Sequence, residues 1–198
     1  AINVSATSNL GLGTGAVDSI TTGDYNVGVG DLALTAVTSG ANNVAIGYGT
    51  LNVSSTAVGN TAVGYYSMRY NSTGGSNTSL GNYALYTNTT GIGNTAVGST
   101  ALQNTTTASY NTAVGDSALK LNTTGQYNTA VGYQSLYSNT NASFNTAIGR
   151  QSLYSNTTGS NNVASGYLAL GLNTTGINNT ASGYQSLYSN TTGGEGVA

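Results

Sequence analysis

The strongest constraint on this chain is a spacing, because an asparagine followed four residues later by a glycine recurs every 17 residues. The spacing holds through eleven repeats without an insertion or a deletion. Each repeat is therefore one geometric unit stacked on the last, since an insertion would displace side chains from the columns that stacking creates. We number each repeat from its asparagine as position one. The asparagines are Asn9, Asn26, Asn43, Asn60, Asn77, Asn94, Asn111, Asn128, Asn145, Asn162 and Asn179, and the glycines of position five are Gly13, Gly30, Gly47, Gly64, Gly81, Gly98, Gly115, Gly132, Gly149, Gly166 and Gly183.

Small and apolar residues also keep their places within the repeat. Position three is always Ala, Gly or Ser, position four is Val, Ile or Leu in nine repeats, and position nine is Leu, Val or Met in all eleven. Positions twelve to fifteen read Asn-Thr-Thr-Gly in five repeats, which favours a turn because Asn and Gly tolerate positive φ. The glycine of position five predicts a second corner. Each repeat thus holds two short apolar segments, each ended by a turn.

This pattern predicts an all-β fold, a parallel β-solenoid in which one 17-residue repeat forms one coil. The repeat is too short for a helix pair, and β-branched residues followed by glycine disfavour helix. About eleven coils would form a single array over residues 1–198, starting at Asn9. Residues 1–8 would continue the register, with Asn3 at position twelve. Neither end would be capped, so we expect an excerpt of a longer chain with flanking domains.

The asparagine column has a physical role in such a stack. Amide side chains repeated at one coil spacing can donate and accept along the axis as a ladder. The alternative is a turn preference copied by duplication. Aspartate in place of Asn43 separates the two, because a charge would disrupt a ladder and a solvated turn would accept it.

The apolar residues are too many for one thin coil to bury. Neighbouring residues on a strand point to opposite faces, yet positions three and four are both small or apolar, and so are positions eight and nine. We therefore expect several chains to associate laterally. The large residues would be divided between coil interior and chain interface, with the assignment of each column open: Val63, Val97, Val114, Val131, Leu102, Leu119 and Leu136.

Composition argues against catalysis, metal binding and a cofactor. The chain has no His and no Cys, which removes the commonest general base, the thiolate nucleophile and the usual metal ligands. Asp31 and Asp116 share position six but lie five repeats apart, too far for a carboxylate pair. Three basic residues do not form a nucleic-acid surface, and no apolar run approaches the roughly 18 residues of a membrane span.

Six repeats begin with closely similar segments, NTAVG at Asn60, Asn94, Asn111 and Asn128, NVAIG at Asn43 and NTAIG at Asn145. These segments resemble the head repeats of trimeric autotransporter adhesins. They are even more similar to repeats of phage tail-fibre proteins that end in an intramolecular chaperone. The resemblance covers essentially the whole chain, although the 17-residue repeat is longer than the adhesin coil. It implies a parallel β-roll of three chains side by side, with the apolar residue of the motif packing the trimer.

Together these features predict a non-enzymatic structural segment of an extracellular fibre, a shaft or head that displays a receptor-binding tip. Its partners would be identical chains, in a homotrimer or filament, and a cell-surface glycan reached through flanking domains. An alternative is a self-assembling surface filament glycosylated at N-x-Ser/Thr sequons. The sequon asparagines are Asn71, Asn88, Asn104, Asn122, Asn156, Asn173 and Asn190.

A further alternative is an ice-binding solenoid, because regularly spaced threonines on a flat face can order water. One such column lies at position two, and the two threonines of each turn form others. The position-two threonines considered are Thr61, Thr78, Thr95, Thr112, Thr129 and Thr146.

Tyrosines recur at positions six and ten. A ladder of amphipathic rings covering the solenoid is the first interpretation, and sugar binding is the alternative. The position-six residues are Tyr48, Tyr65, Tyr133, Tyr167 and Tyr184, and those of position ten are Tyr137, Tyr154 and Tyr188.

Overall fold

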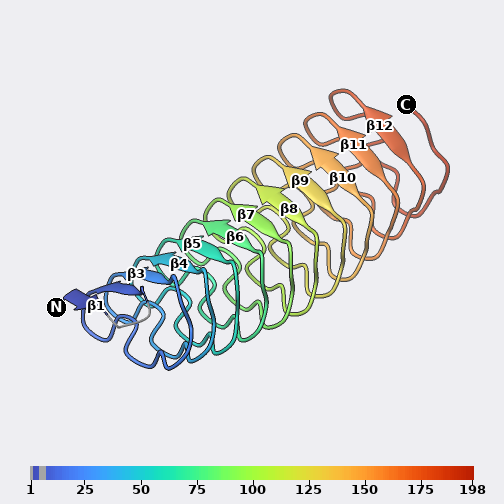
Figure 1. Ribbon diagram of the computed structural model, residues 1–198. Helices are drawn as coiled ribbons and strands as arrows, with labels where there is room; N and C mark the ends of the chain where they lie inside the picture. Colours follow the sequence, from blue (N-terminus) through green and yellow to red (C-terminus); the bar gives the residue numbers. More distant parts are fainter. Residues whose placement is uncertain (1, 5–7) are drawn as a thin grey trace.

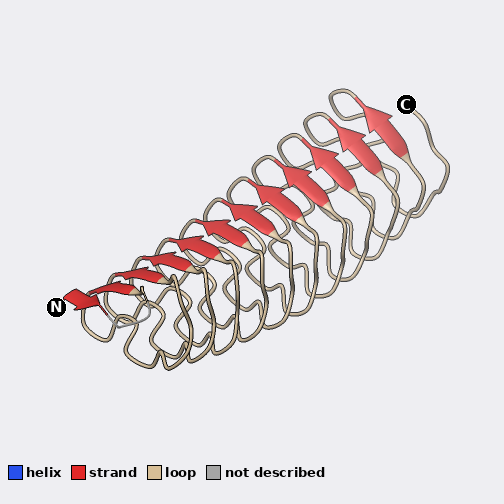
Figure 2. Cartoon of the chain, viewed as in Figure 1, coloured by secondary structure: helices blue, strands red, loops and turns tan. Residues whose placement is uncertain are grey.

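The computed structural model describes residues 2–4 and 8–198 and shows a parallel β-solenoid, which confirms the predicted fold class (Figure 1). Eleven parallel strands stack in sequence order, 17 residues apart, in about 10 turns, and the described residues form no helix (Figure 2). An N-terminal strand, β1 (Ile2–Val4), precedes them. The eleven parallel strands are β2 (Leu10–Leu12), β3 (Val27–Val29), β4 (Val44–Ile46), β5 (Thr61–Val63), β6 (Thr78–Leu80), β7 (Thr95–Val97), β8 (Thr112–Val114), β9 (Thr129–Val131), β10 (Thr146–Ile148), β11 (Val163–Ser165) and β12 (Thr180–Ser182).

Each parallel strand comes from positions two to four of one repeat. Every parallel pair joins equal positions, as in Ala113 with Ala130 and Val114 with Val131 between β8 and β9. Side chains therefore stack in straight columns along the rod, and one repeat makes one coil.

Hydrogen bonds between coils continue round the turns. The backbone N–H of Leu136 donates to the carbonyl of Ser152 at 2.9 Å, and that of Thr157 donates to the carbonyl of Thr174 at 2.9 Å. Buried backbone groups must find partners, and here the next coil supplies them outside the sheet as well. Three strand residues per coil are therefore enough to hold the stack.

The interior of the rod is built almost entirely from small side chains. Positions one, three, eight, nine, twelve and fifteen point inward through most of the array. Position nine supplies a large apolar side chain in each coil, and these residues are fully buried from Leu34 to Leu170. The coil is thin because Ala, Asn, Ser and Gly fill the rest.

The apolar columns divide by position. Leu102, Leu119 and Leu136, at position nine, are fully buried inside the coil. The position-four valines lie on the outer face of the sheet, where Val114 is 36% exposed and the others are half-buried. Serine at position four of β11 and β12 therefore leaves the interior unchanged, and Leu170 remains fully buried.

The N-terminal strand departs from the repeat. β1 runs antiparallel to β2, with Asn3 opposite Gly11. The expected continuation of the register, with Asn3 at position twelve, is therefore wrong, because the segment folds back along β2 and covers its edge. Residues 1 and 5–7 of that expectation lie outside the described residues. At the other end, Val197 bridges Thr180 in parallel, so the register runs on into the last residues.

The corner at position five has a conformation that requires glycine. Every glycine of that column has φ between 125° and 146°, a region that side chains rarely adopt. A Cβ on Gly115 would also lie 2.5 Å from the carbonyl oxygen of Gly132 in the next coil. Both the dihedral angle and the close stacking of coils exclude a side chain here.

The turn at positions twelve to fifteen does not contain the positive φ values that the sequence predicted there. The asparagines of position twelve and the glycines of position fifteen do not have positive φ, whereas positions seven, nine and seventeen do. One coil shows all three, with φ of 54° at Gln134, 50° at Leu136 and 60° at Phe144. The expectation of left-handed Asn and Gly in the Asn-Thr-Thr-Gly segment is therefore wrong.

Candidate functional site

The asparagines of position one form a continuous buried column in which none is more than 2% exposed. The side-chain amide nitrogen of Asn111 donates to Oδ1 of Asn94 at 3.2 Å and to the carbonyl of Gly125 at 3.0 Å. The backbone N–H of Asn111 donates to the same Oδ1 at 3.0 Å. Successive side-chain amides are 3.0–3.3 Å apart from Asn9 to Asn179. One amide thus links three consecutive coils.

A second buried ladder runs through the asparagines of position twelve, and the sequence analysis missed it. The amide nitrogen of Asn139 donates to Oδ1 of Asn122 at 2.9 Å and to the carbonyl of Ala142 at 3.0 Å. The ladder is interrupted where Thr105 replaces asparagine, and there Oδ1 of Asn88 is buried and has no hydrogen-bond partner among the described residues. Seven asparagines in one column of the repeat are a signal that could have revealed it.

Most of the predicted glycan acceptors belong to this second ladder. Their side chains are fully buried, so the folded coil has no room for an N-linked glycan there. Asn104, at position eleven, and Asn190, in the last coil, are half-buried. The buried acceptors are Asn71, Asn88, Asn122, Asn156 and Asn173.

The outer face of the sheet carries two parallel columns, at positions two and four. The threonine hydroxyls of position two make no hydrogen bond within the described residues, and their side chains are exposed or half-buried. The aliphatic side chains beside them form an apolar stripe from β2 to β10, and serine replaces them in β11 and β12. The most exposed members of this stripe, at 36–50%, are Leu12, Ile46, Leu80, Val114 and Ile148.

The two threonines of the turn differ in their availability. The position-thirteen hydroxyl donates to the carbonyl of the next coil, as Thr123 does to Thr140 at 2.9 Å. Position fourteen is exposed in every coil. The inner threonine therefore joins coils, and the outer one faces solvent.

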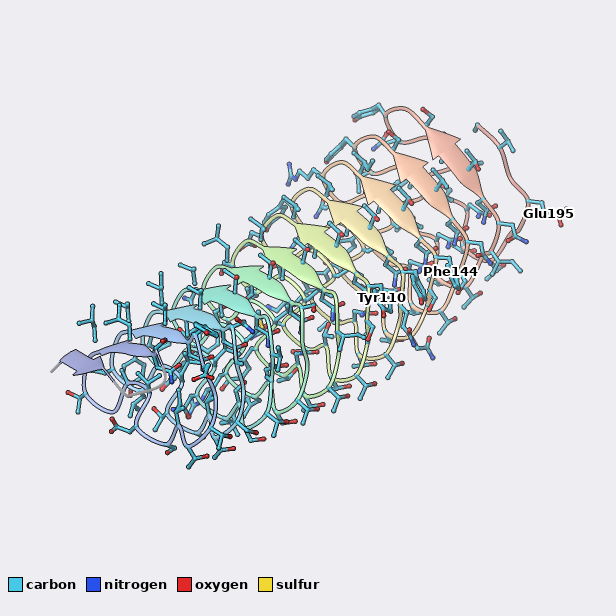
Figure 3. The ribbon with its side chains drawn as sticks, viewed as in Figure 1. Tyr110, Phe144 and Glu195 are labelled. Carbon is cyan, nitrogen blue, oxygen red and sulfur yellow. The ribbon has the colours of Figure 1, made fainter. Side chains whose placement is uncertain are left out.

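Aromatic rings form short stacks on the surface. Tyr137 and Tyr154 stack at 5.3 Å between ring centroids. A column at position seventeen, which the sequence analysis did not consider, stacks Tyr110, Tyr127 and Phe144 at 5.2 Å with interplanar angles of 14° and 5°. Figure 3 shows Tyr110 and Phe144 along one side of the rod, with Glu195 farther along the same side.

Carboxylates are scattered, and two of them make local hydrogen bonds. Oδ1 of Asp31 accepts from the backbone N–H of Thr14 at 2.8 Å, and Oδ1 of Asp116 accepts from the hydroxyl of Ser117 at 2.9 Å. In the part of the chain that the structure describes, no three His, Cys, Asp or Glu side chains gather as a metal site. Residues 2–4 and 8–198 also contain no helix long and apolar enough to cross a membrane.

Comparisons with protein-family models, with curated proteins and with solved structures find no match to this chain.

Proposed function

We propose that this chain is a non-enzymatic structural segment of an extracellular fibre, in which identical chains pack side by side as a trimer. The observation that carries the proposal is the apolar stripe at position four, which lies outward on an unbroken parallel sheet. The interior columns are already filled within one chain, so the side chains of this stripe are not needed to build the core of the coil. Exposed aliphatic rows of this length favour burial against another surface, and a second copy offers the same spacing.

A fibre also fits the mechanics of the coil. Hydrogen bonds run from each coil to the next on several sides of the rod, and repeats that contact only their neighbours extend without a size limit. Such a segment holds a receptor-binding tip at a distance from a virion or a cell.

Light scattering of the purified chain tests the lateral packing. The expected mass is three times the 19.7 kDa of one chain. Val114→Lys combined with Ile148→Lys places two charges in the stripe and is expected to give a monomer. Thr124→Lys combined with Thr158→Lys is the matched control, two coils apart on the exposed position-fourteen column, and should keep the trimer. A monomeric parent chain, or equal masses for both double variants, contradicts the proposal.

Ice binding is a second candidate, favoured by the hydroxyls of position two. Thr112 and Thr129 lie opposite one another in register, and their column shares the flat face with the aliphatic stripe. Thermal hysteresis in solution tests it directly, and its absence at millimolar protein removes the candidate. Because lateral packing would cover this face, a trimer with hysteresis would also be inconsistent with the packing proposed above.

A further inference from the structure

A cluster of aromatic residues around Arg69 breaks the repetition of the array. The cluster occupies positions six, seven, ten and eleven of three consecutive coils, and we name it the tyrosine patch. In the coil that follows, the same positions hold Ser99, Thr100, Gln103 and Asn104, so the coil does not require aromatic residues there. The patch consists of Tyr48, Tyr65, Tyr66, Arg69, Tyr70, Tyr83 and Tyr86.

Tyr48 and Tyr65 stack at 5.6 Å with an interplanar angle of 14°, and the other ring pairs of the patch meet at larger angles. Tyr65 and Tyr66 lie 4.2 Å apart and tilted by 57°, and Tyr70 meets Tyr86 edge-on at 5.0 Å. Tyr48 and Tyr65 are 41% and 46% exposed. The patch therefore offers ring faces and ring edges together on an open surface.

Arg69 gives the patch a positive charge without a counter-ion. Its guanidinium carbon lies 4.2 Å from the ring centre of Tyr66 and 5.3 Å from that of Tyr70. Its Nε is buried and makes no hydrogen bond in the described part of the chain, and no carboxylate there pairs with the side chain. The guanidinium is held in place by the rings and by hydrogen bonds with the hydroxyls of Tyr66 and Tyr86, and it has no carboxylate partner among the described residues.

Hydrogen bonds connect the hydroxyl groups of Tyr48, Tyr65 and Tyr66, and at Tyr66 they outweigh the effect of burial and lower its pKa. Hydrogen bonding with Tyr66 and burial raise the pKa of Tyr65 to about 12, and hydrogen bonding with Tyr66 raises the pKa of Tyr48. At neutral pH the hydroxyls of Tyr48 and Tyr65 donate as well as accept. They can therefore serve a ligand that is rich in hydroxyl groups.

We propose that the tyrosine patch binds a sugar that carries a carboxylate, with the pyranose ring against the tyrosine rings and the carboxylate on Arg69. A guanidinium matches a carboxylate through paired hydrogen bonds, and an aromatic face packs the apolar C–H face of a sugar. A simple anion would leave the rings unused, and a neutral sugar would leave the guanidinium unused. The patch lies beyond the position-five corner and contains no residue of the position-four stripe. The sugar site and the lateral packing are therefore independent proposals, and a test that contradicts one leaves the other unaffected.

Nitrogen NMR of the intact chain tests the site, because the chain contains two arginines, Arg69 and Arg150. Their Nε–H signals are recorded during titration with 3′-sialyllactose, trigalacturonic acid and lactose, and Arg150→Gln assigns the two signals. We expect either acidic sugar to shift the Arg69 signal while the Arg150 signal stays in place and lactose shifts neither. The acidic sugar that binds more tightly identifies the source of the carboxylate.

Substitutions then distinguish binding by the whole tyrosine patch from binding through the charge of an arginine alone. Arg69→Gln is expected to weaken binding of the acidic sugar about tenfold, as loss of a charge-assisted pair does. Tyr66→Phe tests the hydroxyl group without removing the ring. Arg150→Gln is the matched control, since Arg150 lies 5.7 Å and 5.6 Å from the ring centres of Tyr133 and Tyr167 but outside the patch. Equal shifts of both arginine signals, no shift of either, or equal affinity for lactose overturns the proposal.

Discussion

At the scale of the residue, Asn43 shows what holds one coil to the next. Its side-chain amide nitrogen donates to Oδ1 of Asn26 at 3.0 Å and to the carbonyl of Ala57 at 2.8 Å. Its own Oδ1 accepts from the side-chain and backbone nitrogens of Asn60 at 3.1 Å and 3.0 Å. A buried amide whose groups are all paired is stabilising, and one lost partner leaves a desolvated group that costs about 1–3 kcal/mol.

Asn43→Asp is therefore expected to destabilise the chain by about 3–5 kcal/mol at pH 7, because a buried charge would face two acceptors. Burial raises the pKa of such a carboxyl. The penalty is present above that raised pKa and shrinks as the pH falls through it, since the protonated group is neutral and can donate. Urea unfolding at pH 7 and pH 4 measures both effects. Asn141→Asp, at an exposed position, is the control, and an equal cost at both sites would refute the structural role of the column.

The backbone of the turns could not be predicted from residue types. Leu136 has φ of 50° and Gln134 has φ of 54°, although an L-residue in the left-handed region costs roughly 1–2 kcal/mol. Local propensity assigns that region to Gly and Asn, so the sequence indicated positions twelve and fifteen. Stacking overrides local preference here, because the residue after each turn must meet its column in the next coil.

At the scale of the element, one coil interrupts the second asparagine ladder. Thr105 occupies the place of asparagine, and its hydroxyl donates to the carbonyl of Asn122 at 3.3 Å. Oδ1 of Asn88 therefore stays buried, and the part of the chain that the structure describes offers it no hydrogen-bond donor. In an intact rung the corresponding acceptor is paired, as where the amide nitrogen of Asn156 donates to Oδ1 of Asn139 at 3.1 Å.

Thr105→Asn is expected to stabilise the chain by about 1–2 kcal/mol, because the new amide can donate to Oδ1 of Asn88. The measurement is the midpoint of thermal or urea unfolding. Thr105→Val is the control of equal size to threonine, which removes the hydroxyl and leaves the orphan acceptor in place, and it should not stabilise. A stabilisation that the valine variant shares would show that the acceptor is not responsible.

The repeat pattern predicted the asparagine ladder of position one but not the ladder of position twelve. The column of position one stood out because asparagine fills it in every repeat, and its spacing alone implied contact between amides. Asparagine at position twelve begins at Asn71 and skips Thr105, and the Thr-Thr-Gly that follows resembles a surface turn. The direction of a side chain in such a turn depends on the φ values of its neighbours, which the sequence did not show.

At the scale of the whole molecule, the 17-residue period alone predicted the architecture. The strands of the structure then showed which side chains face the interior of the rod and which face outward. Counting 17 residues predicted one coil per repeat, and the parallel register confirms it. The outward direction of position four could not be derived, because positions three and four are both small or apolar. Burial of Ala113 and exposure of Val114 in one strand settle the question, since adjacent side chains alternate.

Because each coil contacts only its neighbours, the effect of a destabilising substitution on the rod depends on the coil in which it lies. Gly115→Ala combines strain at φ of 135° with a Cβ that would lie 2.5 Å from the carbonyl oxygen of Gly132. Gly183→Ala at φ of 129° brings the same strain, about 1–3 kcal/mol, but its Cβ would meet none of the described residues within 4 Å. The difference between the two variants isolates the steric contact between coils.

We expect Gly115→Ala to cost several kcal/mol more than Gly183→Ala and to divide the rod into two segments that unfold separately. Hydrogen exchange should then show lost protection in the coils around Gly115, with protection kept near both ends. Urea unfolding should broaden or split, because each segment exposes less surface than the whole chain. A single sharp transition with uniform loss of protection would mean that cooperativity extends along the entire rod and that nearest-neighbour stacking is not its basis.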